Sequence, residues 1–158
     1  MDSKQVLHDL IARLPDRLRA MPAVKIQHKP APNIWSVKEE LGHLLDSAAN
    51  NHQRIVRAQL EEKPAMPGYD GDAWVVLHRY QQRDWETLIG LWAALNRQLL
   101  AAAEAASESA WPRILTIADS APLTLQFVFD DYLRHMLHHL RHMGVAVEDL
   151  APAKAAAC

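Results

Sequence analysis

Residues 123–143 read LTLQFVFDDYLRHMLHHLRHM, and this stretch decides the fold. Its apolar residues recur at spacings of three and four, which is the period of an amphipathic helix. It holds two histidine pairs with helical spacing, His135 with His139 and His138 with His142. With about 100° between neighbouring residues, the first pair lies at the edge of the apolar stripe, while His138 turns toward the charged face and His142 is ambiguous. We therefore expect His135 and His139 to point into the protein.

Three other stretches have the same helical period and would also have to bury an apolar stripe. They run over about residues 3–20, 36–62 and 72–107, and no stretch shows a convincing strand pattern. Four amphipathic helices of this kind predict an all-α protein, a four-helix bundle. The bundle would form one domain over residues 1–150, with a disordered tail over 151–158.

The connectors between these helices are rich in proline and glycine. Residues 22–34 hold three prolines and are expected to be extended, and residues 63–71 read KPAMPGYDG. At about 3.3 Å per residue the second connector can extend about 30 Å, enough to cross the length of a bundle. Ser120 and Pro122 are suited to the start of the fourth helix and Gly144 to its end.

Composition and charge restrict the partners and the compartment. The 158 residues carry a formal net charge of −2, which gives no basic field for a nucleic acid. No apolar run of about 18 residues exists, so we expect no membrane span. The single cysteine, Cys158, cannot form an internal disulfide, which favours a reducing compartment and a cytoplasmic location.

The stretch 33–46, NIWSVKEELGHLLD, starts the second helix and offers a further histidine. Ser36 and Glu39 have the spacing of a capping box. His43 follows within two turns and flanks the apolar stripe, with Glu40 and Ser47 on the same side. A polar seam on the inner face of a helix is typical of a metal site buried in a bundle.

Histidines four residues apart on a helix can meet one metal ion at about 2.0–2.1 Å. Neutral imidazoles suit zinc, nickel, copper or iron, but two ligands do not close a site. We therefore predict a divalent metal site formed by His43, His135 and His139. The remaining histidines outside residues 135–142 are interpreted as surface or core residues, namely His8, His28, His52 and His78.

The two stretches together resemble the signatures of the DinB-like superfamily. Asn33 to Asp46 is similar to its Trp-Ser-x-x-Glu run followed by a histidine, two apolar residues and Asp, and Tyr132 to His142 is similar to its His-x-x-x-His helix. This resemblance implies a bundle with up-down-down-up topology and metal-binding histidines at positions 43, 135 and 139. It implies zinc or nickel as the metal, with manganese or iron as alternatives. It also implies a small-molecule substrate and either a thiol S-transferase that uses a low-molecular-weight thiol or a metal-dependent hydrolase.

Three functional hypotheses follow for such a site. A metal with an open position can activate a bound thiol, which gives a transferase, or a bound water, which gives a hydrolase. The third is a non-catalytic protein in which the metal only holds the helices together. Glu40 is the candidate catalytic base or the partner that orients an imidazole, with Asp131 and Asp46 as alternatives. A homodimer that packs through apolar helix faces is a further expectation.

Overall fold

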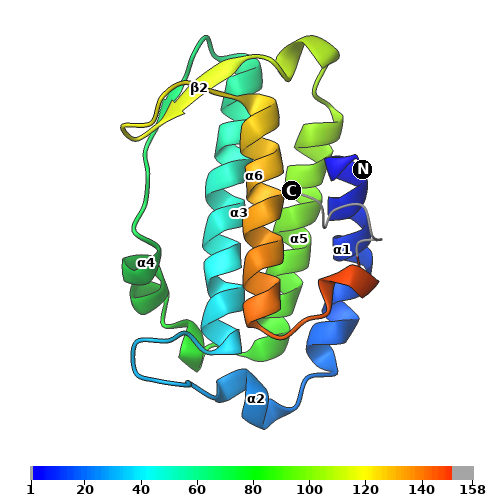
Figure 1. Cartoon of the computed structure of the whole chain (residues 1–158), viewed down its shortest axis with the longest axis vertical. Helices are drawn as coiled ribbons and strands as arrows, with labels where there is room; N and C mark the ends of the chain where they lie inside the picture. The colour runs from blue at the N-terminus through cyan, green and yellow to red at the C-terminus, as the bar shows by residue number, and fades with distance from the viewer. Residues whose placement is uncertain (1, 151–158) are drawn as a thin grey trace.

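Four long helices pack lengthwise in the computed structural model, which describes residues 2–150 (Figure 1). They are α1 (Ser3–Arg19), α3 (Val37–Leu60), α5 (Trp85–Glu104) and α6 (Leu125–His142). In Figure 1, α1 and α6 run downward while α3 and α5 run upward. The predicted four-helix bundle and its up-down-down-up order are therefore confirmed. The predicted tail over 151–158, including Cys158, lies outside the described residues.

Helix α3 packs closely against two of the other long helices. It packs against α5, which runs parallel to it, and against α6, which runs antiparallel, while α1 packs against α5. Parallel neighbours require the chain to return the full length of the bundle between them. Residues 61–84 make this return along the outside of the bundle, and the predicted extended connector, residues 63–71, forms only part of it (Figure 1).

Each long helix begins at a side chain that accepts a backbone hydrogen bond. Asp2, Ser36, Asp84 and Thr124 cap α1, α3, α5 and α6 in this way. At α3 the predicted capping box is complete, because Glu39 also accepts from the backbone N–H of Ser36. Gly144, with a φ of 74°, follows the end of α6 as predicted.

The prediction of one helix over residues 72–107 was wrong. The chain forms α4 (Gly71–His78), a short 3₁₀ turn η1 (Tyr80–Gln82) and then α5. Arg79 adopts a left-handed conformation with a φ of 52°, which ends α4, and Asp84 starts a new helix as an N-cap. This break turns the ring of Tyr80 into the bundle, where it is buried.

The expectation that the connectors hold no regular structure also needs correction. Residues 22–34 contain a short helix, α2 (Ala23–Gln27), and three short strands lie at the opposite end of the bundle. They are β1 (Ala65–Met66), β2 (Ile114–Ile117) and β3 (Leu123–Thr124). β2 pairs in parallel with β1 and antiparallel with β3, so two distant connectors are hydrogen-bonded together. The last helix was expected to run from about Leu123 to Met143; because Leu123 and Thr124 form β3, it instead begins at Leu125, with Thr124 as its cap.

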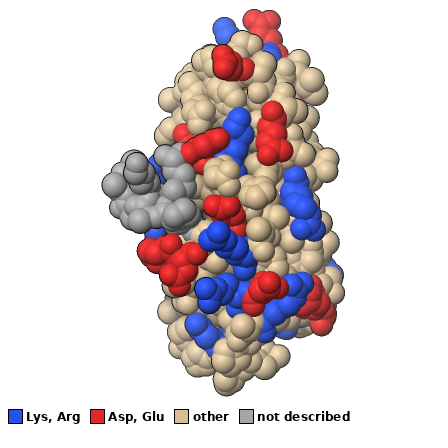
Figure 2. All heavy atoms as spheres, turned by 90° about the vertical axis from the view of Figure 1, so that its right-hand side faces the viewer, with Lys and Arg blue, Asp and Glu red and all other residues tan. Residues whose placement is uncertain are grey.

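The core of the bundle is mainly apolar. Fully buried aromatic and leucine side chains fill the bundle, including Trp92, Phe129 and Tyr132. Figure 2 shows acidic and basic side chains mixed over the face that carries α1, so that face has no single-sign field. Within residues 2–150, no helix combines the length and the apolar character that crossing a bilayer requires.

The Tyr80 ring packs directly against Gly42 of α3, and substitution of this glycine tests that contact. A Cβ atom at Gly42 would lie 2.1 Å from ring carbons of Tyr80, whereas a Cβ at Gly90 on α5 would meet nothing within 4 Å. We expect Gly42→Ala to lower the free energy of unfolding by about 1–3 kcal/mol through overpacking. Gly90→Ala should raise it by about 0.4–1 kcal/mol, because it only restricts the unfolded chain. Urea denaturation measures both, and a Gly42→Ala protein as stable as the wild type would contradict this packing.

Candidate metal centre

Three histidines from two helices converge on one point inside the bundle. His43 comes from α3, while His135 and His139 lie one turn apart on α6. The Nε2 atom of His135 lies 3.1 Å from Nε2 of His43 and 3.0 Å from Nε2 of His139. Two nitrogens that bind one zinc ion tetrahedrally at 2.0–2.1 Å are about 3.3 Å apart. The spacing of the three nitrogens therefore fits a single metal ion.

Burial keeps two of these rings neutral. It lowers the pKa of His43 to about 3, with further lowering by the neighbouring His139 and His135. The pKa of His135 falls to about 4, again mainly through burial. Both side chains are therefore unprotonated at neutral pH, so their nitrogen lone pairs are available to a cation.

Two outer contacts fix how the rings on α6 are turned. The Nδ1 atom of His139 lies 2.6 Å from Oε2 of Glu40, and Nδ1 of His135 lies 3.4 Å from Oγ of Ser47. A carboxylate accepts hydrogen bonds and donates none, so His139 donates from Nδ1 to Glu40. With that proton on Nδ1, a neutral His139 ring carries its lone pair on Nε2, which faces the shared point. Glu40 and His139 are each less than a tenth exposed, which protects this contact from water.

His43 is held by packing. Its ring lies against Trp35, with centroids 4.7 Å apart, and among the described residues its buried Nδ1 atom has no hydrogen-bond partner. Its orientation therefore depends on the aromatic wall and on the neighbouring histidines. This residue is the least anchored of the three.

The other candidate residues lie away from the shared point. Asp131 is exposed and pairs with Arg134. Asp46 accepts a hydrogen bond from the Tyr80 hydroxyl and pairs with His78. His138 is exposed, as expected.

The ambiguous histidine, His142, belongs to a second group of potential ligands. It is half-exposed, and its Nδ1 lies 3.5 Å from Oε1 of Glu40. Glu40, His139 and His142 together offer ligand atoms within 4.8 Å of one another. However, a metal ion bound by this second group would have to replace the hydrogen bond between Glu40 and His139. It would also take His139 away from the three-histidine group.

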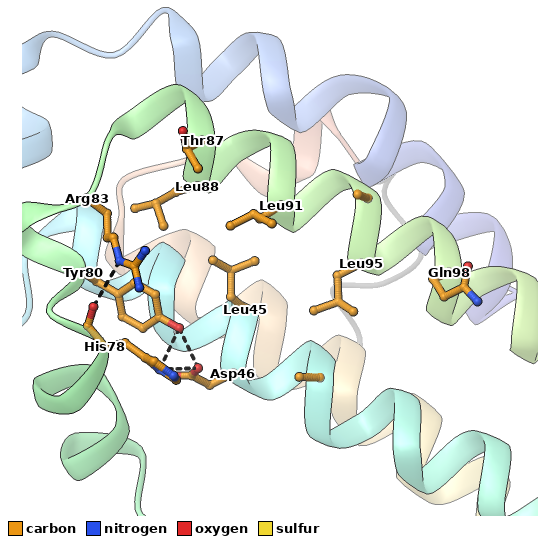
Figure 3. Close-up of a pocket in the computed structure, with 12 residues that line it drawn as sticks. Leu45, Asp46, His78, Tyr80, Arg83, Thr87, Leu88, Leu91, Leu95 and Gln98 are labelled. Carbon is orange, nitrogen blue, oxygen red and sulfur yellow. Dashed lines mark hydrogen bonds and ion pairs between the residues drawn. The ribbon is translucent and has the colours of Figure 1, made fainter.

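Two cavities lie on different sides of α3. The larger, of about 530 Å³, is an open apolar groove between α3 and α5, with Asp46, His78 and Tyr80 at one end (Figure 3). None of the three convergent histidines lines it. The smaller, of about 130 Å³, is lined by His135 together with residues of α3, the strands and α6. Of these two cavities, the smaller is the one that a convergent histidine lines.

The smaller cavity contains polar residues that the sequence analysis missed. They are Asn51, Arg54 and Tyr69. Asn51 and Arg54 lie eight and eleven residues after His43, so they continue the face of α3 that carries His43 and Ser47. This helical spacing could have identified Asn51 and Arg54 as residues on the same face as His43. Tyr69 lies in a connector, where no periodic signal exists.

Comparison with known protein families gives a clear match. The family model for the DinB superfamily matches residues 7–143. A Bacillus subtilis protein described as "putative metal-dependent hydrolase YfiT" is 27% identical over 147 residues, which cover 88% of this chain and 79% of the relative. A protein of Halalkalibacterium halodurans with the same description is 24% identical over 147 residues, covering 87% of this chain and 82% of the relative.

Two solved structures share the fold. The structure of Bacillus subtilis YfiT, described as having an unusual four-helix bundle topology, superposes with a TM-score of 0.72 at 24% identity, covering 91% of this chain and 87% of that one. A mutant of the mycothiol-dependent maleylpyruvate isomerase superposes with a TM-score of 0.74 at 13% identity, covering 92% of this chain and 60% of that one. At these identities the likeness concerns the fold alone.

The lowered histidine pKa values predict how the stability of metal-free protein depends on pH. An unfolded histidine has a pKa near 6.5, whereas folded His43 and His135 have values of about 3 and about 4. Between pH 6.5 and 4 the unfolded chain therefore binds more protons, so the free energy of unfolding should fall as the pH is lowered through this range. One such group contributes at most about 1.4 kcal/mol per pH unit.

Urea denaturation in the presence of a chelator, at several pH values from 7 to 4, measures this slope. The His43→Asn variant is the matched control, because it removes one of the two groups and leaves every other titrating residue in place. Its slope should be shallower than that of the wild type. Equal slopes would show that His43 is not held neutral by the fold.

Proposed function

The chain belongs to the DinB superfamily, and on this premise we propose that it is a metal-dependent enzyme whose single divalent ion is held by His43, His135 and His139. The observation that carries the proposal is the approach of three Nε2 atoms within hydrogen-bonding distance of their neighbours. Nitrogens this close repel one another when their lone pairs converge, unless a proton or a cation lies between them, and a divalent ion satisfies all three at once. The donor set, three neutral imidazoles, suits zinc or nickel, with manganese or iron as alternatives.

The chain's own residues have distinct roles in this proposal. The ion supplies Lewis acidity, which makes a water or a thiol nucleophilic at neutral pH. Glu40 is a positioning residue, because its carboxylate accepts the Nδ1 proton of His139 and thereby aims Nε2. Ser47 does the same for His135 over a longer contact. This assignment replaces the role of catalytic base for Glu40.

The reaction we propose first is the transfer of a low-molecular-weight thiol to a small electrophile. The thiol sulfur would form a bond to carbon, the leaving group would depart with the bonding electron pair, and the thiol proton would pass to solvent. This reaction needs no general base on the protein once the thiol is ionised. That requirement matches the site, because the nearest buried carboxylate, Glu40, is occupied by His139.

A hydrolase is the second candidate, and the descriptions of the bacterial relatives favour it. Hydrolysis by an activated water uses a base that accepts a proton, and Asp131 is the available carboxylate because it lines the cavity beside His135. A non-catalytic role, in which the ion only joins α3 to α6, is the third. The homodimer and the cytoplasmic location stay predictions.

Metal binding provides the first test. We expect isothermal titration with Zn²⁺ or Ni²⁺ to give one ion per wild-type chain. His135→Asn should abolish this binding, and Glu40→Gln should weaken it about 10- to 100-fold through loss of the acceptor for His139. His138→Asn is the matched control from the same helix and should bind like the wild type. Equal loss in the two histidine variants, or no binding by the wild type, would contradict the site.

Turnover separates the three functional candidates. A thiol S-transferase should conjugate monobromobimane with at least one thiol of a cellular panel, should stop after chelation, and should recover when metal is restored. A hydrolase should instead cleave members of an ester and amide panel without added thiol. If neither panel reacts while metal removal lowers the melting temperature, the ion has a structural role only. His138→Asn should retain whichever activity is found, and His135→Asn should lose it.

A further inference from the structure

Arg54 on α3 is a buried cation without an anionic partner. Its residue surface is 9% exposed, and among the described residues no carboxylate oxygen lies within 4.0 Å of its guanidinium. Its side chain makes one hydrogen bond, from Nη1 to Oδ1 of Asn51 at 3.3 Å. A guanidinium stays charged and offers five N–H donors, so most of its donors are unused by side chains. Burial of a charge without a partner is unfavourable, which calls for an explanation.

The cavity beside the metal centre supplies one. Arg54 and His135 both line the cavity of about 130 Å³, so the cation and a predicted metal ligand face the same space. The side chains between them form a connected series. Asn51, which accepts from Arg54, donates to Oγ of Ser47 at 3.4 Å, and that oxygen contacts Nδ1 of His135. The position of Arg54 is therefore tied to that of the centre.

The walls of the cavity show what kind of molecule would fit. Its apolar side is made by Ile117, Leu123, Phe127 and Val128, and its polar side by α3 and Tyr69. The one acidic side chain that lines it, Asp131, pairs with Arg134 at the surface. The space is thus amphipathic, and its one arginine contacts no described carboxylate, although the charge of Asp131 acts on it from farther away.

We propose that Arg54 binds a carboxylate of the substrate and that the substrate is a small carboxylic acid whose reacting end faces His135. This inference rests on the proposed metal-dependent function. A guanidinium matches a carboxylate through two parallel hydrogen bonds. The volume corresponds to about four water molecules at roughly 30 Å³ each, which suits a carboxylate on a short carbon chain. A single cation also suits a monoanion better than a doubly charged phosphate.

Binding of simple anions to the zinc-loaded protein tests the proposal. The probes are propionate, neutral propionamide of nearly the same shape, and inorganic phosphate, each titrated by ¹⁵N–¹H NMR. We expect propionate to shift the amide signals of cavity residues and propionamide to leave them unchanged. Arg54→Gln should weaken propionate binding at least tenfold, and Arg54→Lys should restore part of it. Arg57→Gln, which removes an exposed arginine of the same helix, should bind propionate like the wild type.

The outcomes distinguish this inference from the proposed function. Zinc affinity is measured for every variant, and Arg54→Gln should bind zinc like the wild type. The same titration on metal-free protein shows whether propionate still contacts Arg54 when zinc cannot attract it. Wild-type protein that binds zinc but not propionate, that binds propionate equally well after Arg54→Gln, or that prefers phosphate overturns the carboxylate assignment. Wild-type protein that binds no zinc overturns the metal-dependent function instead. A circular dichroism spectrum of each variant confirms that it is folded.

Discussion

The contact between α3 and α6 is the constraint on which the functional part of this structure depends. It brings the imidazole of His43 against those of His135 and His139, with nitrogens that all face one point. Such an arrangement is tolerated only while the rings are neutral, because three imidazolium ions at this spacing would repel strongly. Burial supplies that neutrality for His43 and His135, and the Glu40 carboxylate orients His139.

A bundle that holds so many polar groups inside needs stability from elsewhere. The inner face of α3 buries Glu40, Ser47, Asn51 and Arg54 next to His43. The interface between α1 and α5 has the opposite character, because α1 buries only apolar residues. Leucine packing there adds to the hydrophobic stabilisation from the apolar side chains that α3 and α6 also bury. The buried polar side chains of α3 are thus held within one largely apolar core.

The relatives show why the fold does not by itself specify the reaction. One protein described as "a probable metal-dependent hydrolase" and one mycothiol-dependent maleylpyruvate isomerase both superpose on this bundle. Function depends on which side chains surround the site rather than on the helices that carry them. In this chain the side chains beside the site include those that line a cavity of about 130 Å³ next to His135, with the cation of Arg54 in its wall. The open groove between α3 and α5 is larger, but it does not reach the convergent histidines.

The sequence by itself determined whatever depends on neighbours along one helix. The spacing of His135 and His139 places their side chains together in any helix, and Ser36 with Glu39 sets the start of α3 without help from other elements. The remaining features of the fold and the site depend on which helices and connectors pack against each other. The break at Arg79 goes with a Tyr80 ring that packs at Gly42, and the short strands require two connectors 50 residues apart in sequence to meet. The sequence also could not predict that Arg54 is buried without a carboxylate in contact. That feature depends on every element that surrounds the residue, whereas periodicity describes one helix at a time.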